Sequence, residues 1–391
     1  MYNRELQGEL LRLGNIFPVV SVVGPRQSGK TTLCKLSYPN YDYVNLEDSQ
    51  TWAQAMEDMR MFLTTTSQGM IIDEAQRLPE LFSMIQVLVD EDKSRKFILT
   101  GSSNFALLPK IRQSLAGRTA VLTLLPFSIK ELGTNLPSSI DSLLLNGFYP
   151  AVWGDQQPAQ DVYRAYYNTY LQRDVSDLIT LRNIKQFQRF LLLVAARVGS
   201  EFNAQSIGND VGVSVPTIQE WMNVLETSYI AFRKYPYYKN IGKRLAKMPK
   251  VYFYDTGLAC HILGIENEQQ LNIHPCRGGL FENLVMVEFL KQTYNAGKDD
   301  HLYFYKDKTH EVDIVLENGL ALSAYEVKIA DTDNTAFYKS LRYFQQLYGD
   351  DVISTQVIYS GAQERLSAFN GLRNYLFFFS NDKHSQQLTK E

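Results

Sequence analysis

The sequence is short of cysteine and histidine. Its three cysteines, Cys34, Cys260 and Cys276, lie far apart, which excludes a disulfide framework and a paired-cysteine metal site. The five histidines show no metal-ligand spacing, so no zinc site is expected. This cysteine usage is typical of a reducing compartment, and we expect a cytoplasmic protein.

Long apolar runs are absent as well. Residues Met1 to Leu13 alternate charged and leucine positions without the apolar core of a signal peptide. The longest apolar stretches, Ile16 to Val23 and Phe190 to Ala196 among them, are much shorter than the roughly 20 residues of a membrane span. We therefore expect no membrane association, and interpret these two stretches as a buried strand and a core helix.

Neither sign of charge dominates. Lys and Arg total 39 against 42 Asp and Glu, for a formal net charge of -3. This balance argues against a general nucleic-acid coat, although it is compatible with a local basic patch. With 391 residues, of which 45% are hydrophobic and 21% charged, the chain is expected to fold into several globular domains.

Apolar periodicity divides the chain into three zones. In the first, short β-branched runs alternate with helical ones, which predicts an α/β domain with a parallel sheet flanked by helices. The middle zone is helical with a small β element, and the last mixes strands with helices. We expect domains at residues 1–135, 161–265 and 275–391, with a connector at 136–160. The candidate strands of the first zone are Phe17 to Val23, Tyr41 to Leu46, Met70 to Ile72, Lys96 to Leu99 and Thr119 to Leu124.

A phosphate-binding motif, G-x-x-x-x-G-K-[ST], follows the first candidate strand and precedes a helix. Its glycines let successive backbone amides turn towards one phosphate, and the helix adds its positive N-terminal end. We expect Lys30 to reach the β and γ phosphates and the hydroxyl of Thr31 to ligate Mg²⁺. The motif thus predicts a site for ATP and Mg²⁺, with binding residues Gly24, Pro25, Arg26, Gln27, Ser28, Gly29, Lys30, Thr31 and Thr32.

Two further strand ends supply acids and hydroxyls for this site. Asp73 ends the run from Met70 and is expected to hold Mg²⁺, while the adjacent Glu74 orients and polarises the attacking water. After the strand that ends near Leu99, Ser102 is the first candidate for a contact with the γ-phosphate and Thr100 the second.

An arginine is also expected near the γ-phosphate, because a guanidinium neutralises charge that develops in the transition state. Arg118, in Leu115-Ala-Gly-Arg118, is the candidate arginine finger, and Arg173 is a weaker one. The alternative interpretation of Arg118 is an ordinary surface arginine.

The chain resembles the prokaryotic AAA-type ATPases whose P-loop domain precedes a C-terminal domain of unknown function with a nuclease-like fold. This resemblance implies an AAA-type nucleotide switch that often works as an oligomer, and it leaves the biological task open. Besides the P-loop, it is carried by Ile72-Asp-Glu-Ala-Gln76, Leu99-Thr-Gly-Ser-Ser103, Leu115-Ala-Gly-Arg118, Tyr252-Phe-Tyr-Asp-Thr-Gly-Leu258 and Gly279-Leu-Phe-Glu-Asn283.

The middle zone predicts a winged-helix-like region. Helical patterns at Phe187 to Val198, Asn203 to Asp210 and Val215 to Thr227, with a tight turn before the last, are typical of a helix-turn-helix. A basic segment without acids follows and could lie along a DNA backbone. The alternative is a structural connector whose basic residues pair with acids elsewhere. The basic residues are Arg233, Lys234, Lys239, Lys243, Arg244, Lys247 and Lys250, and Thr217, Gln219 and Asn223 are the candidates for base contacts.

The last zone carries polar residues whose order resembles the PD-(D/E)xK nuclease pattern. Glu282 is predicted on a helix, Asp313 on one strand, and Glu326 and Lys328 on the same face of the next. Two carboxylates at one point can bind Mg²⁺, and the lysine can position the attacking water. Two alternatives stay open. The acids pair with lysines across a sheet without metal, or the fold is retained for binding alone.

Together these patterns predict an ATP-hydrolysing AAA-type protein with a P-loop α/β domain, a winged-helix-like region and a restriction-endonuclease-like α/β module. One hypothesis couples nucleotide state to action on DNA through that module. The other is a nucleotide-switched binding or scaffold protein with a catalytically silent module.

Overall fold

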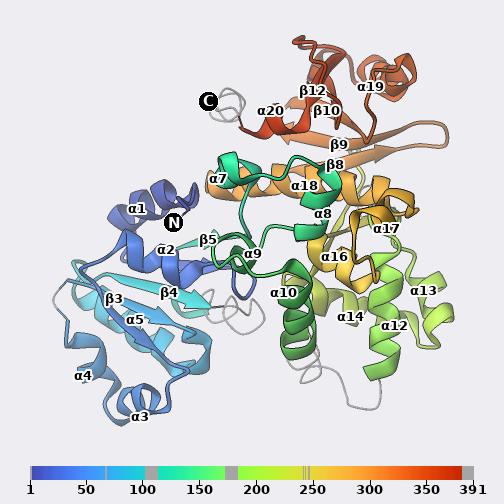
Figure 1. The fold of residues 1–391 in the computed structure, drawn as a ribbon. Coiled ribbons are helices and arrows are strands. Elements are labelled where there is room, and N and C mark those ends of the chain that lie inside the picture. The colour runs from blue at the N-terminus through green and yellow to red at the C-terminus, as the bar shows by residue number, and fades with distance from the viewer. Residues whose placement is uncertain are drawn as a thin grey trace. The chain divides into compact units, whose positions relative to one another are not determined.

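The structure, a computed structural model, describes residues 2–66, 68–101, 113–171, 184–240, 242, 244 and 247–380 (Figure 1). The chain forms two compact units. The first comprises residues 1–127 with 227–229 and 293–299, and the second comprises 128–226, 230–292 and 300–391. Among the described helices, none has the length and apolar character needed to cross a membrane.

A five-stranded parallel sheet forms the centre of the first unit. Its strands are β1 (Val19–Val23), β2 (Asp42–Asn45), β3 (Met70–Asp73), β4 (Phe97–Gly101) and β5 (Thr119–Thr123), in the order β2-β3-β4-β1-β5. Every pairing is parallel. The predicted α/β fold with a parallel sheet is therefore confirmed, and each strand overlaps its candidate run.

Helices cover the sheet because its central strands are apolar on both faces. All five residues of β1 are buried, as expected when helices pack on both sides of a parallel strand. The helices are α1 (Leu6–Ile16), α2 (Lys30–Ser37), α3 (Ser49–Glu57), α4 (Met59–Thr64), the 3₁₀ turn η1 (Ala75–Arg77) and α5 (Glu80–Glu91). One buried layer joins α1 and α2 to the sheet and contains Leu6, Leu10, Val20, Val22, Leu33, Cys34, Ile71, Ile98, Leu122 and Leu124.

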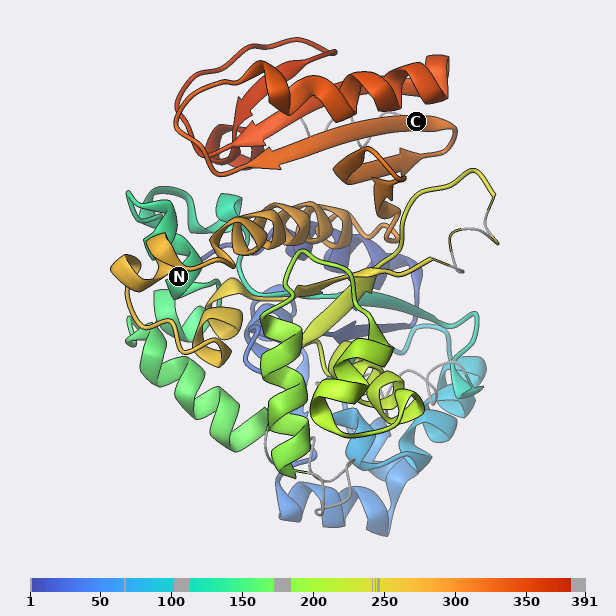
Figure 2. The same ribbon diagram turned by 90° about the vertical axis from the view of Figure 1, so that its right-hand side faces the viewer.

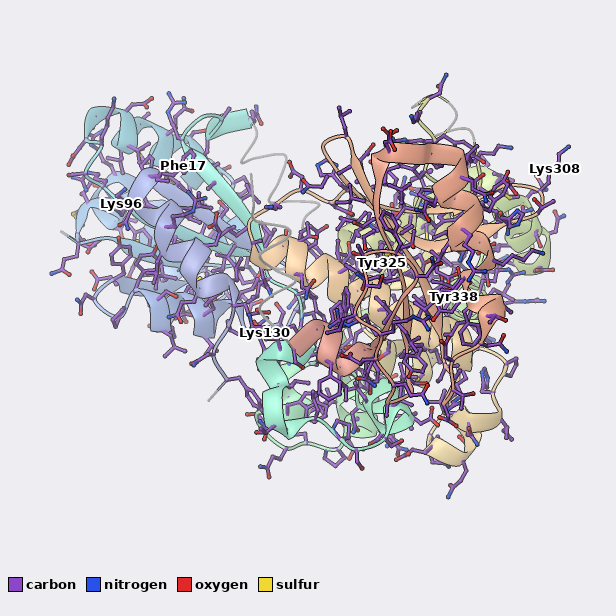
Figure 3. All side chains as sticks on the ribbon, turned by 90° about the horizontal axis from the view of Figure 1, so that it is seen from above. Phe17, Lys96, Lys130, Lys308, Tyr325 and Tyr338 are labelled. Carbon is purple, nitrogen blue, oxygen red and sulfur yellow. The ribbon has the colours of Figure 1, made fainter. Side chains whose placement is uncertain are left out.

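The start of β4 is tied to the segment before β1. Lys96 and Phe17 both belong to the first unit and are labelled in Figure 3. Lys96 donates from Nζ to the carbonyl oxygens of Gly14 at 2.9 Å and Phe17 at 3.1 Å. These bonds satisfy backbone acceptors at the amino-terminal edge of the sheet, which helps to fix the register of β1 beside β4.

The second unit begins with helices where a connector was predicted. Helices α7 (Ile129–Leu132), α8 (Ile140–Asn146), α9 (Pro150–Trp153) and α10 (Ala159–Tyr166) follow one another, with the 3₁₀ turn η2 (Gly133–Asn135) and the π-helical segment η3 (Tyr167–Leu171). Leu143, Leu144, Phe148 and Tyr149 are buried. Residues 136–160 therefore differ from the expected connector, because their apolar side chains form part of the core of this unit.

Helices and two short strands come next in the part of the chain that the structure describes. They are α12 (Ile184–Ala195), α13 (Ala204–Val211), α14 (Val215–Thr227), β6 (Ala231–Lys234) and β7 (Lys250–Phe253), and β6 pairs with β7 in antiparallel fashion. Gly212 ends α13 with a φ of 81°, a left-handed conformation that suits glycine and allows the tight turn into α14. Helices α16 (Thr256–Ile262) and α17 (Glu268–Ile273) complete this part.

A mixed sheet lies near the C-terminus. After α18 (Arg277–Asn295) come β8 (Leu302–Lys306), β9 (Glu311–Asn318), β10 (Ala321–Lys328), the turn η5 (Thr335–Tyr338), α19 (Lys339–Tyr348), the turn η6 (Gly349–Asp351), β11 (Val352–Tyr359), β12 (Gly371–Asn374) and α20 (Tyr375–Ser380). The strand order is β12-β11-β10-β9-β8. Strands β8, β9 and β10 pair in antiparallel fashion, whereas β10, β11 and β12 are parallel.

Helix α19 lies along this sheet (Figure 2) and supplies part of its core. Leu341 and Phe344 of α19 are fully buried against residues of β9, β10 and β11. The mixture of strands and helices predicted for the last zone is found here, where η5 and α19 precede β11. Strand β12 and helix α20 were not predicted, because they are short segments without a clear apolar alternation.

Candidate functional site

The loop between β1 and α2 has the conformation that its glycines permit. Gly24 has a φ of 144° and lies so close to β5 that an added Cβ would come within 2.2 Å of the Leu124 carbonyl oxygen. Gly29 has a φ of 92° and caps the amino end of α2. The strand, loop and helix thus follow in the predicted order, and the loop lies at the carboxyl end of a parallel strand, where ligands bind in open α/β sheets.

Lys30 folds back over this loop. Its side chain is buried, and Nζ donates to the carbonyl oxygens of Gly24 at 3.0 Å and Pro25 at 2.7 Å. Burial lowers the pKa of Lys30 to about 8, against the opposing effect of the carboxylates of Glu74 and Asp73. An ammonium held by neutral carbonyls keeps its charge available for a phosphate.

Asp73 gathers hydroxyl groups from three neighbouring elements. Its carboxylate accepts hydrogen bonds from Thr31 Oγ1 at 2.7 Å, from the Tyr43 hydroxyl at 3.0 Å and from Thr100 Oγ1. Thr31 and Asp73, the two predicted metal ligands, therefore lie together. A hydroxyl and a carboxylate are oxygen ligands that suit Mg²⁺, so these residues fit the ion that accompanies a nucleotide.

Tyr43 is a site residue that sequence reasoning missed. It lies on β2, whose residue Val44 pairs with Ile72 of β3, and this register brings its ring beside Asp73. The only signal in the sequence was its place on a predicted strand, and strand order cannot be read from that. Thr100, the second candidate for a contact with the γ-phosphate, is buried on β4 and donates its hydroxyl to Asp73.

Glu74 has an unusual backbone conformation directly after β3. Its φ of 53° and ψ of 43° place it in the left-handed region, which is uncommon for a residue with a side chain and is concentrated at functional sites. Its carboxylate accepts a hydrogen bond from Gln76 Nε2. Its negative charge raises the pKa of Lys30 against the opposing effect of burial, so Glu74 and Lys30 interact electrostatically.

Arg4 is a second residue that the sequence analysis missed. Its guanidinium donates from Nη1 to the Ser28 carbonyl oxygen at 2.7 Å and from Nη2 to the Leu125 carbonyl oxygen at 2.6 Å. It therefore ties the phosphate loop to the segment that follows β5. Of the remaining loop residues, Arg26 lies 4.0 Å from Glu47, Gln27 has a φ of 60°, and Thr32 is exposed on α2.

Arg118, the candidate arginine finger, does not lie near the phosphate loop of its own chain. Arg118 directly precedes β5, and Thr119 pairs with Val19 at the start of β1, so Arg118 lies at the edge opposite the phosphate loop. Its guanidinium binds the Asp90 carboxylate at 2.6 Å and 2.7 Å. Arg118 cannot reach a nucleotide in its own chain, because the whole length of β1 lies between Arg118 and the phosphate loop. The other candidates, Ser102 and Arg173, fall outside the described residues.

The basic segment after α14 is largely paired with acids, which favours the alternative interpretation. Arg233 bonds to Glu226 and also to the side-chain oxygens of Gln219 and Asn223, two of the residues expected to contact bases. Most charges of the predicted DNA wing therefore have acidic partners within the second unit, and DNA contact by this segment stays a prediction. The other pairs are Lys234 with Asp300, Lys239 with Asp351, Arg244 with Glu317, and Lys250 with Glu282 and Glu311. Lys243 lies outside the described residues, Lys247 is exposed, and Thr217 contacts Ser214.

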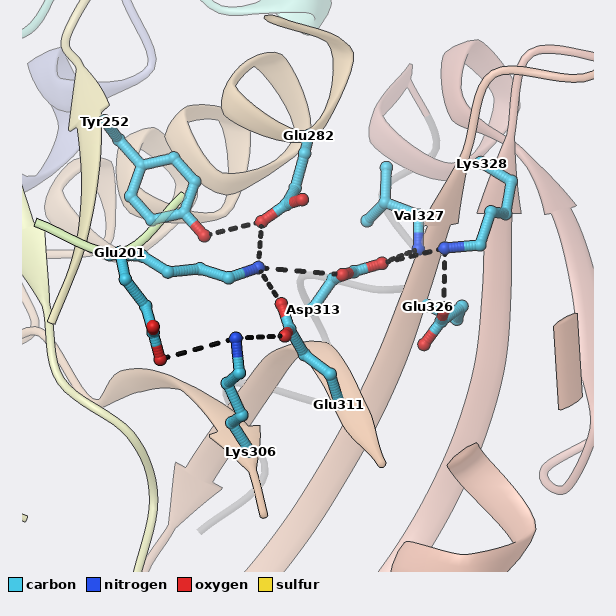
Figure 4. A network of polar contacts seen from close by, with 10 residues as sticks. Glu201, Tyr252, Glu282, Lys306, Glu311, Asp313, Glu326, Val327 and Lys328 are labelled. Carbon is cyan, nitrogen blue, oxygen red and sulfur yellow. Dashed lines mark hydrogen bonds and ion pairs between the residues drawn. The ribbon is translucent and has the colours of Figure 1, made fainter. Parts of the chain in front are cut away.

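The four residues of the nuclease-like pattern lie together in the second unit (Figure 4). Glu282 comes from α18, Asp313 from β9, and Glu326 and Lys328 from β10. Lys328 Nζ lies 2.6 Å from Glu326 Oε1 and 3.4 Å from Asp313 Oδ2. We call these four residues, with Glu311, Lys250 and Lys306, the carboxylate cluster.

Lysines neutralise the acids of the carboxylate cluster. Lys250 lies 2.8 Å from Glu282 Oε1 and 2.6 Å from Glu311 Oε1. Burial raises the pKa of Glu282 and of Glu326, and a neighbouring Asp313 charge adds to both shifts. The described residues contain no group of three or more acids, histidines or cysteines open to a metal ion. With ammonium groups already on its oxygens, the cluster does not fit Mg²⁺ in this conformation.

Three parts of the chain match known protein families. Residues 17–133 match a family described as an AAA domain. Residues 137–269 and 277–373 match two domains of unknown function, DUF8612 and DUF4143. The first match confirms the predicted AAA-type ATPase domain, whereas the other two leave the winged-helix-like and nuclease-like predictions as predictions.

Sequence similarity to other proteins extends beyond the AAA domain. An uncharacterized protein of Mycobacterium tuberculosis is 29% identical over 87% of this chain and 76% of its own length. An uncharacterized protein of Haemophilus influenzae is 22% identical over 80% of this chain and 78% of its own length. A solved structure, the Walker-type ATPase paby2304 of Pyrococcus abyssi, aligns with a TM-score of 0.48 at 14% identity, covering 67% of this chain and 96% of that one.

Proposed function

We propose that the protein binds ATP with Mg²⁺, hydrolyses it, and uses the nucleotide state to switch the binding properties of its second unit. The single observation that carries the proposal is the meeting of Lys30, Thr31 and Asp73 at the carboxyl ends of parallel strands. The AAA-domain match over residues 17–133 supports it independently.

The roles of the residues follow from their contacts. Phosphates bind the amides of the loop from Gly24 to Lys30 and the amino end of α2. Lys30 exchanges its bonds with two backbone carbonyls for bonds with phosphate oxygens, and Thr31 and Asp73 hold Mg²⁺. When bound, Mg²⁺ supplies positive charge that stabilises the charge developing on the transferred phosphoryl group. Glu74 orients the attacking water.

Substitution of Asp73 tests this proposal. Asp73→Asn keeps the shape of the side chain but removes the charge that Mg²⁺ requires, so Mg²⁺-dependent ATP hydrolysis should fall by at least about 100-fold. Asp90→Asn is the matched control, since Asp90 is an acid of the same unit that pairs with Arg118 on the surface. Equal hydrolysis by the wild type and Asp73→Asn would contradict the proposal.

Action on DNA is the second candidate for the output of the switch. Its support is the grouping of Glu282, Asp313, Glu326 and Lys328 in the order of a nuclease pattern. The lysine contacts of these acids and the ion pairs of the basic segment favour a docking role instead. Self-association, which the AAA resemblance implies, is part of the proposal and is measured by sedimentation with and without ATP.

A cleavage assay separates the two outputs. Wild-type protein and Asp313→Ala are incubated with plasmid DNA and Mg²⁺, with and without ATP. For a docking role we expect the same absence of cleavage in both proteins. Cleavage by the wild type that Asp313→Ala loses would establish a nuclease and overturn the docking role.

A further inference from the structure

Lys250 holds the central position of the carboxylate cluster. Its side chain is 3% exposed, and its ammonium lies 2.8 Å from Glu282, 2.6 Å from Glu311 and 3.8 Å from Asp313. These acids come from a helix and a strand, α18 and β9, while the lysine comes from β7. A single cationic group thus bridges acids of two separate elements.

The fold fixes the ammonium in this place. Strand β7 pairs with β6 along its whole length, with Lys250 opposite Lys234. Tyr252, two residues further on the same strand, donates its hydroxyl to Glu282 Oε1 at 2.7 Å and so holds the same acid. The ammonium also lies 5.4 Å from the centre of the Phe304 ring. Lys250 is therefore a packed residue of the strand and not a loose surface side chain.

The oxygens that a metal would need are already in use. Asp313 Oδ1 faces Lys250, and Asp313 Oδ2 accepts hydrogen bonds from the Val327 amide at 2.8 Å and from Lys328 at 3.4 Å. Four carboxylates, those of Glu282, Glu311, Asp313 and Glu326, face the three ammonium groups of Lys250, Lys306 and Lys328. A divalent cation would add charge to a group that is nearly balanced.

We propose that Lys250 is a built-in cation that occupies the metal position of the carboxylate cluster and keeps divalent metal out while β7 is in place. Removing this ammonium leaves Glu282 without a lysine partner and leaves Glu311 and Asp313 with Lys306 and Lys328 alone, so four carboxylates face two ammonium groups. Closely spaced carboxylates that outnumber their cationic partners are the arrangement that Mg²⁺ and Mn²⁺ bind. All these residues belong to the second unit, so the inference does not depend on ATP hydrolysis.

Manganese binding to the full chain tests the proposal. Mn²⁺ is titrated without nucleotide and followed by electron paramagnetic resonance, and the phosphate loop is identical in every variant, so its contribution cancels. The side chain of Lys250→Met has a similar length and no charge. This variant should bind one Mn²⁺ more per chain than the wild type. The affinity of its cluster for Mn²⁺ should be at least about tenfold higher than that of the wild-type cluster. Lys250→Arg retains the charge and should gain no site. Lys250→Met combined with Asp313→Asn should lose the new site.

Lys306→Met is the matched control, because Lys306 touches the same Glu311 from a more exposed position. It should leave Mn²⁺ binding as in the wild type. Circular dichroism checks that Lys250→Met is folded, and a folded variant without the extra site would overturn the proposal. Asp313→Asn alone keeps Lys250 and provides a test that does not need Lys250→Met. The proposal expects unchanged Mn²⁺ binding, and a loss relative to the wild type would show that the native cluster already binds metal.

Discussion

Lysine and carboxylate meet in two regions of this protein with opposite consequences. In the phosphate loop, Lys30 bonds to two neutral backbone carbonyls, which an incoming phosphate can replace. In the carboxylate cluster, Lys250 bonds to Glu282 and Glu311, so each charge already has its partner. The first arrangement leaves a cation ready for an anion, whereas the second leaves neither sign available. Residue types alone do not define a site, because their partners decide which charge remains.

The largest effect is expected in the loop, where Lys30→Ala removes the only lysine of the motif. ATP affinity should fall by at least about 100-fold, because the phosphates lose a charge-assisted contact in a partly buried site. Isothermal titration calorimetry measures it. Lys96→Ala is the control, since Lys96 also binds two backbone carbonyls of this unit and should retain ATP affinity. Normal ATP binding by Lys30→Ala would remove the distinction between the two regions.

Glu74→Gln should separate binding from turnover. The amide keeps the size of the side chain but loses the charge that polarises water, so hydrolysis should fall by about 100-fold or more with ATP affinity nearly unchanged. Phosphate release and ATP titration are measured on the same preparation. Glu80→Gln, at an exposed acid that begins α5, is the control. Equal phosphate release by both variants would refute the role of Glu74.

In the cluster the expected effect is on stability. Lys250→Met leaves buried acids without their counter-ion, which should lower the free energy of unfolding by about 3–5 kcal/mol. Lys306→Met removes a more exposed pair and should cost about 1 kcal/mol or less. Urea unfolding at neutral pH compares the two. Similar losses for both variants would show that Lys250 has no special place in the cluster.

The smallest effect should come from Arg118. Because its guanidinium pairs with Asp90 on the surface, Arg118→Ala should change the free energy of unfolding by about 1 kcal/mol or less. ATP affinity measured on dilute protein should be unchanged, since Arg118 lies at the far edge of the sheet from the loop. A large loss of ATP affinity would contradict this geometry.

Prediction from sequence succeeded where a signal is local. The strands of the first unit and the phosphate loop were predictable because β-branched runs and fixed glycine spacing act over a few neighbouring residues. The short strand β12 and the short helices α8 and α9 carried no such signal. Their positions depend on packing against segments distant in the chain.

The sequence by itself determined that a phosphate loop would follow a buried strand, and that Asp313, Glu326 and Lys328 would lie on paired strands. Only the tertiary structure decided that Tyr43 and Thr100 donate hydrogen bonds to Asp73. It also decided that Arg118 lies at the end of the sheet opposite the phosphate loop, and that Lys250 contacts Glu282. The physical reason is range. Backbone conformation follows from adjacent residues, whereas the partner of a charged side chain depends on which distant segments fold against it.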